Sequence, residues 1–314
     1  MSLTLEFARR PSAIAYQLRA LVPSRGLDGG FPSIRARWRG HRLRAAYVAE
    51  LLELTDLDAL FVPDEQPQLR SDPGRDVFFP HVFGFPLQMA IITHPAFPLA
   101  IWKALQIRQS FIRHRPLPLD EALSLETSVA GQRVLDKGAE VDLYTAVCAR
   151  DELIWEGLNT FYYRGRFGAP GAAATLAKAP EVGSAALSTW HMASSGGRRF
   201  AALTGDYNGI HLWRWYARLL GFRGAFLHPQ RVLGQCLARL PAREGGAAQR
   251  LDVWLKGPVY YGSRVELAVD PEAGGLVFAL RADRDARPAL IGRLSSSDGP
   301  DRGLLDPLDR LSRP

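Results

Sequence analysis

Residues 200–211 read FAALTGDYNGIH. A carboxylate, an amide and an imidazole stand close together in this stretch, at Asp206, Asn208 and His211. The neighbouring glycines, Gly205 and Gly209, permit a sharp backbone path, so the loop is able to aim the carboxylate and the imidazole at one water or one substrate carbon. Such a pair makes a general base and a general acid, because histidine titrates near neutral pH and a nearby carboxylate tunes it.

The same residues also allow a purely structural interpretation. In that interpretation Asp206 caps the helix that follows, Asn208 and Gly209 form a turn, and His211 is a partly buried histidine with a satisfied hydrogen bond. Spacing alone favours this interpretation, because short motifs often match by chance.

The surroundings of the motif extend the pattern. Ala217 and Gly221-Phe222 follow it, and His228 stands at the head of an apolar helix. Together with residues 200–211, they resemble the hydratase 2 motif of MaoC-like enzymes, which are R-specific enoyl-CoA hydratases and 3-hydroxyacyl-thioester dehydratases of the hot-dog fold. The resemblance implies that Asp206 and His211 bind the catalytic water, with Asn208 supporting the loop and Gly205 beside the substrate.

Two positions depart from the family pattern. Gly209 replaces the usual proline, and His228-Pro229 replaces a His-Gly pair whose glycine N–H stabilises the enolate in the family. Proline has no N–H, and losing one such donor typically costs about a hundredfold to a thousandfold in rate. Our hypothesis is that the N–H of Gln230 takes over, supported by the helix dipole, so that His228, Pro229 and Gln230 join the substrate-binding set.

The resemblance implies a hydro-lyase that reversibly hydrates a 2-enoyl thioester to an (R)-3-hydroxyacyl thioester, as in fatty acid metabolism. The carrier is then coenzyme A or acyl carrier protein, and neither a redox cofactor nor a metal is implied. Two alternatives stay open: an acyl thioesterase with the same dyad, and a non-catalytic acyl-binding protein that has lost the oxyanion-hole glycine.

The chain repeats its layout about a central linker. His94-Pro95 and His228-Pro229 each precede apolar residues at helical spacing, and each half then alternates apolar residues with period two. We therefore predict an α+β protein of two helix-wrapping antiparallel sheets joined edge to edge, which the resemblance identifies as a double hot-dog. The predicted parts are an N-terminal, non-catalytic half at 1–168, a linker at 169–185, a C-terminal half carrying the motif at 186–297, and a tail at 298–314.

A second Asp and His occur at the same spacing in the first half, at Asp76 and His81. A match of two residues is weak evidence for a second site, so we expect the first half to maintain the fold and to shape an acyl pocket. The aromatic residues of 78–85 either line that pocket or, as is more usual for such residues, belong to the core. Trp213 and Trp215, just past His211, either flank the substrate or simply pack, and packing is the favoured interpretation.

Composition narrows the function further. The chain has 314 residues and a net charge of +7, but its basic residues are scattered, and the densest run, residues 35–44, is interpreted as a solvated helix face and not as a nucleic-acid site. The charge-free stretch 77–102 is interrupted by prolines, so we interpret it as buried core and not as a membrane span. We expect a cytoplasmic protein, monomer or homodimer.

Overall fold

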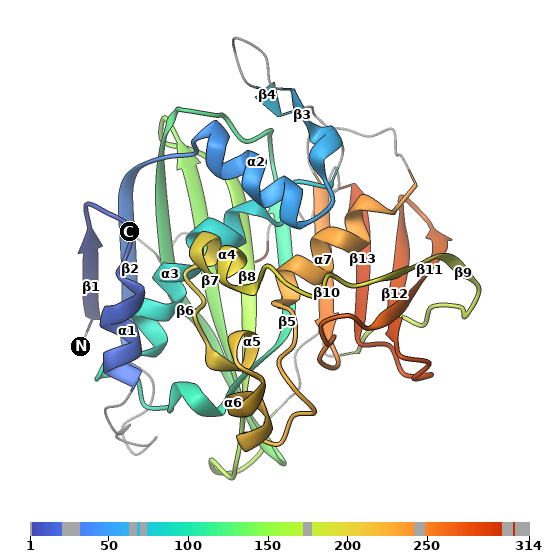
Figure 1. Cartoon of the computed structure of the whole chain (residues 1–314). Helices are drawn as coiled ribbons and strands as arrows, with labels where there is room; N and C mark the ends of the chain where they lie inside the picture. Colours follow the sequence, from blue (N-terminus) through green and yellow to red (C-terminus); the bar gives the residue numbers. More distant parts are fainter. Residues whose placement is uncertain are drawn as a thin grey trace.

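One sheet of eleven strands organises the molecule, in the order β1-β2-β6-β7-β8-β5-β10-β13-β12-β11-β9 (Figure 1). The computed structural model describes residues 2–20, 32–62, 68–69, 74–171, 178–241, 249–296 and 304. The sheet is antiparallel throughout except where β1 (Ser2–Phe7) pairs in parallel with β2 (Ser33–Arg42) at one edge.

The two halves of the sheet have the same topology. The first consists of β2, β6 (Ala122–Leu135), β7 (Gly138–Ala149), β8 (Glu152–Arg164) and β5 (Ala104–Arg113). The second consists of β9 (Ala186–His191), β11 (Arg264–Glu272), β12 (Gly275–Ala282), β13 (Leu290–Ser296) and β10 (Gln249–Leu255). In each half the spatial order is first, third, fourth, fifth and second strand. The halves meet where β5 pairs with β10, which confirms the predicted continuous sheet.

Each half places one central helix between its first and second strands. These helices are α3 (Phe79–Ile92) and α7 (Pro229–Ala238), and both lie against the sheet in Figure 1. Both carry a proline in the first turn, where a missing N–H removes no hydrogen bond. They pack into a single core whose buried side chains come from both halves.

The first central helix does not begin at His94-Pro95, so this part of the sequence prediction was wrong. His94 lies in the turn after α3, where its N–H bonds to the carbonyl of Ile91, and β5 already begins at Ala104. The sequence concealed α3 because every residue in it except Met89 is buried, which leaves no polar face to reveal the period, and because Pro86 interrupts it.

The short elements that accompany each central helix differ between the halves. The first half contributes α1 (Ala13–Ala20), α2 (Ala45–Leu54), two single turns, η1 (Asp58–Leu60) and η2 (Ile101–Lys103), and the short pair β3 (Phe61–Val62) and β4 (Gln68–Leu69). The second half contributes α4 (Gly197–Thr204), α5 (Gly209–Leu212) and α6 (Arg214–Leu219) between β9 and α7. The motif of residues 204–211 therefore bridges α4 and α5.

The basic run is a strand, which corrects the predicted helix face. Ile34, Ala36 and Trp38 of β2 are buried, while Arg35 and Arg37 point outward and pair with Glu126 on β6. Within the described residues, no helix is long and apolar enough to cross a membrane.

The predicted linker falls between β8 and β9. Its described parts, 169–171 and 178–185, contain no helix or strand, and the tail at 298–314 lies outside the described residues except for Leu304. The division into two domains stays a prediction.

Candidate active site

The motif begins where α4 ends. Gly205 is the C-cap of α4 with φ of 77°, a left-handed conformation that favours glycine. A Cβ at this position would lie 2.7 Å from the Tyr16 hydroxyl, and that hydroxyl donates a hydrogen bond of 2.8 Å to the Gly205 carbonyl. The glycine thus permits both the turn and the close approach of α1.

The next turn is held by side-chain oxygens. Thr204 Oγ1 accepts from the Asp206 N–H at 3.0 Å, and Asp206 Oδ1 accepts from the Asn208 N–H at 3.1 Å. Asn208, and not Asp206, is the N-cap of α5, because its Oδ1 accepts from the Ile210 N–H at 3.2 Å. The cap role of the structural interpretation therefore falls on Asn208 and leaves the second carboxylate oxygen of Asp206 available.

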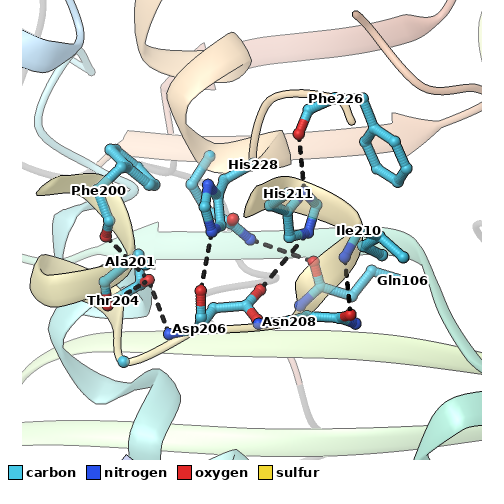
Figure 2. A network of polar contacts seen from close by, with 12 residues as sticks. Gln106, Phe200, Ala201, Thr204, Asp206, Asn208, Ile210, His211, Phe226 and His228 are labelled. Carbon is cyan, nitrogen blue, oxygen red and sulfur yellow. Dashed lines mark hydrogen bonds and ion pairs between the residues drawn. The ribbon is translucent and has the colours of Figure 1, made fainter. Parts of the chain in front are cut away.

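That oxygen faces His211 (Figure 2). Asp206 Oδ2 lies 3.7 Å from His211 Nε2, while His211 Nδ1 lies 3.0 Å from the Phe226 carbonyl. A carbonyl only accepts, so Nδ1 carries the proton and the neutral ring presents its Nε2 lone pair toward the carboxylate. Burial lowers the pKa of His211, and the carboxylate and the Phe226 carbonyl offset this only in part.

His228 stabilises the loop from behind. Its Nε2 donates to the main-chain carbonyl of Asp206 at 2.9 Å, and its ring stacks on His211 with centroids 4.1 Å apart. Burial and the neighbouring His211 hold the pKa of His228 well below its usual value. The ring is buried behind the loop and is not among the residues that line the cavity, and the substrate contact expected from sequence stays a prediction.

Pro229 and Gln230 open α7. Pro229 lines the cavity, and Gln230 supplies the first N–H of the helix. Among the described residues this N–H has no hydrogen-bond acceptor, whereas the N–H of Arg231 already bonds to the His228 carbonyl at 3.0 Å. The Gln230 side chain is occupied elsewhere, donating to His81 Nε2 at 3.0 Å and to Gln106 Oε1 at 3.2 Å.

A cavity of about 840 Å³ lies in front of the motif. Its volume is within the usual range for small-molecule sites. Both halves line it mainly with apolar side chains, among them Phe85, Met89, Ile101, Phe161, Phe222, Phe226, Val232 and Leu290. Of the aromatics at 78–85 only Phe85 reaches the cavity, while Phe78, Phe79 and Phe83 belong to the core.

Sequence reasoning missed contacts made by distant segments. Tyr16 of α1 donates to the Gly205 carbonyl. Arg10, which precedes α1, donates to the carbonyls of Ala202 and Leu203, and Tyr47 of α2 also donates to the Leu203 carbonyl. Gln106 of β5 lies beside the dyad in Figure 2 and lines the cavity. No local pattern signals these residues, because each lies far along the chain from the motif.

Asp76 and His81 do not form a second dyad. Asp76 is buried against the guanidinium of Arg113, and His81 is held by Gln88, Gln109 and Gln230. Burial lowers the pKa of His81 to about 3. Within the described residues, the grouping able to hold a metal ion is Asp206, His211 and His228, whose ligand atoms all lie within 4.8 Å of one another.

Comparison with known proteins supports the resemblance seen in the sequence. No family model matches the chain. A curated relative, 3-hydroxyacyl-thioester dehydratase X of Mycobacterium tuberculosis, is 28% identical over 213 residues, covering 68% of this chain and 75% of the relative.

Solved structures agree on the fold. The crystal structure of HtdX from Mycobacterium tuberculosis superposes with a TM-score of 0.67 at 22% identity, covering 83% of this chain and 99% of that one. A MaoC-like dehydratase from Phytophthora capsici gives 0.65 at 15% identity, covering 84% and 95%. A Mycobacterium tuberculosis protein described as having a double hot-dog fold gives 0.50 at 18% identity, covering 82% and 93%. The predicted double hot-dog fold and the likeness to MaoC-like dehydratases are confirmed.

Proposed function

We propose that this protein is a hydro-lyase that reversibly adds water to 2-enoyl thioesters to give (R)-3-hydroxyacyl thioesters. The observation that carries the proposal is the Asp206 and His211 pair, 3.7 Å apart at the wall of a large apolar cavity. The name of the curated dehydratase relative supports the same reaction.

In the hydration direction, one water lies between Asp206 Oδ2 and His211 Nε2. His211 Nε2 takes a proton from this water as its oxygen bonds to C3, and the C2–C3 electron pair moves toward the thioester oxygen. The imidazolium formed is stabilised by the Asp206 carboxylate and returns its proton to C2 as the enolate collapses. Because both steps occur on one face of the substrate, the elements of water add in syn fashion.

The enolate oxygen needs a fixed donor. Pro229 has none, so we assign this role to the N–H of Gln230, which is the first N–H of α7 and has no acceptor among the described residues. The N-terminal end of a helix adds a partial positive charge there. His228 and Asn208 act as positioning residues, since they bind the loop and not the reacting atoms.

The substrate is an acyl thioester of coenzyme A or of acyl carrier protein. The apolar lining suits an acyl chain, and the net charge of +7 suits either anionic carrier. A cytoplasmic location, and a monomeric or homodimeric state, stay predictions.

The test follows the loss of enoyl-thioester absorbance when the purified protein meets trans-2-enoyl-CoA substrates of several chain lengths. We expect turnover that Asp206→Asn and His211→Gln each lower by about a hundredfold to ten-thousandfold. The matched control is Asp285→Asn, which removes an exposed carboxylate that pairs with Arg287 and should leave the rate unchanged.

Other outcomes would assign the alternatives. Release of free thiol that depends on Asp206 would identify an acyl thioesterase. Substrate binding without turnover at any chain length, unchanged in Asp206→Asn, would identify a non-catalytic acyl-binding protein.

A further inference from the structure

Exposed apolar side chains concentrate at one end of the molecule. Nine large apolar residues are exposed among those described, and eight of them surround or adjoin the cavity mouth. We call these eight the mouth patch: Leu18, Trp102, Leu105, Tyr207, Trp213, Trp215, Leu219 and Leu220. The ninth, Leu187, lies on β9, an edge strand of the sheet, and does not line the cavity.

The two tryptophans do not simply pack, which was the favoured interpretation: both are exposed, and Trp213 lines the cavity. Trp215 is 67% exposed and Leu219 76% exposed on α6, the helix at the lower edge of Figure 1. The rings of Trp213 and Trp215 stack with centroids 6.4 Å apart, which makes a continuous aromatic surface from the cavity wall onto α6. Burying such large side chains in water-free surroundings is favourable, so their common exposure at one place indicates an interaction surface.

Cations stand among these apolar side chains. Seven of the eight patch residues lie in the segments 13–20, 100–105 and 209–222, which also expose Arg19, Lys103, Arg214 and Arg218 and contain no Asp or Glu. The eighth, Tyr207, follows Asp206, whose carboxylate faces His211 at the cavity wall. Tryptophan and leucine interleaved with arginine and lysine are the side chains that settle at the boundary between lipid headgroups and acyl chains.

We propose that the mouth patch docks the protein onto the surface of an anionic lipid bilayer, with the cavity opening toward the membrane. Acidic headgroups would neutralise the four cations, and the acyl boundary would accept Trp215 and Leu219. A second copy of the chain fits less well, because two-fold pairing of this patch would oppose Arg214 and Arg218 with their own copies and offer no carboxylate. This inference is independent of the reaction proposed above.

Vesicle flotation tests the proposal with the full chain. The wild-type protein should float with vesicles of phosphatidylcholine containing an equal part of phosphatidylglycerol, and much less with pure phosphatidylcholine. The double substitution Trp215→Ser/Leu219→Ser should lower the partition coefficient at least about tenfold, because both side chains leave the acyl boundary. Arg214→Gln/Arg218→Gln should lower it about fivefold per arginine, on anionic vesicles alone.

Leu187→Ser is the matched control, since it removes a leucine that is 53% exposed on an edge strand of the sheet and should not change flotation. All variants should retain wild-type enoyl-CoA turnover, because neither Trp215 nor Leu219 lines the cavity. Failure of the wild-type protein to float with either vesicle would overturn the proposal, as would equal losses in Leu187→Ser and the patch variant.

Two further results would replace the bilayer with another occupant. Light scattering could find a dimer that Trp215→Ser/Leu219→Ser converts to a monomer. If the protein also did not bind vesicles, this result would assign the patch to a second copy. Binding to an acidic acyl carrier protein that the same substitutions abolish, again without vesicle binding, would assign it to the carrier.

Discussion

The spacing D-x-x-x-x-H occurs in both halves, and the two copies have opposite environments. Asp76 and His81 lie deep in the core, where Arg113 neutralises the carboxylate and three glutamine side chains surround the imidazole. Asp206 and His211 face each other at a cavity wall, with their other polar atoms used by main-chain groups. The comparison shows that spacing alone does not make a dyad; the carboxylate must lack a stronger cationic partner.

The largest effects are expected when the aspartate of each copy is replaced by asparagine, because the two substitutions should change different properties. Asp76→Asn should lower the free energy of unfolding by about 3 to 5 kcal/mol, because it leaves Arg113 buried beside a neutral amide, and should leave kcat within about twofold. Asp206→Asn should do the reverse, abolishing turnover while changing the free energy of unfolding by less than about 1 kcal/mol, since the amide oxygen still accepts from Asn208.

Denaturant unfolding and enoyl-CoA hydration on both variants provide the measurements. A loss of turnover in folded Asp76→Asn equal to that in Asp206→Asn would contradict the contrast and restore a catalytic role for the first half.

The pH dependence of the rate should report the titration of His211 in the Asp206 and His211 dyad. His211 must be neutral to accept a proton, and burial lowers its pKa below 6.5, so kcat/KM should be flat near pH 7 and fall about tenfold per unit once the pH drops below that lowered pKa. The Asp206 carboxylate raises the pKa of His211, so Asp206→Asn should move the titration of this imidazole to still lower pH. An NMR titration of His211 in both proteins checks the direction; a shift to higher pH in the variant would refute the assignment.

Much of the fold was accessible from the sequence. Apolar residues alternate in the strands at 141–147, 265–269 and 276–280 because one face of the sheet covers the core. Leu143 and Phe278, for example, are buried on that face. The helix α3 was not accessible, because its complete burial removes the polar face on which periodicity depends. The run at 35–44 misled for the opposite reason: its arginines obscured the buried alternation of β2.

The candidate site was likewise predictable only in part. Asp206, Asn208 and His211 lie within one local turn, so their composition revealed them. Tyr16 of α1 holds this turn through the Gly205 carbonyl, and Gln106 of β5 accepts from the Gln230 side chain beside it; only the packing of the chain brings these distant residues near the motif. Long-range placement of this kind leaves no spacing in the sequence to detect.

Pro229 offers a sharper comparison between this protein and the family pattern that it resembles. Pro229→Gly would restore the usual glycine N–H at the first position of α7. We expect kcat to rise by less than about tenfold, because the Gln230 N–H already serves the enolate, whereas a missing donor would be worth a hundredfold or more. Pro116→Gly, at an exposed position in the loop before β6, is the control for added backbone freedom. A hundredfold rise would show that Gln230 does not replace the lost donor.

The smallest effect should come from the contact between α1 and the motif. Tyr16→Phe removes the hydroxyl that donates to the buried Gly205 carbonyl, and the unpaired carbonyl should cost about 1 to 3 kcal/mol of unfolding free energy. Because Gly205 immediately precedes Asp206, kcat should also fall a few-fold. Tyr47→Phe is the comparison: its hydroxyl donates to the Leu203 carbonyl of α4, which Arg10 continues to bind, so it should lower stability by less than Tyr16→Phe and leave kcat unchanged. Equal kcat in the two variants would mean that α1 stabilises the fold but does not position the carboxylate.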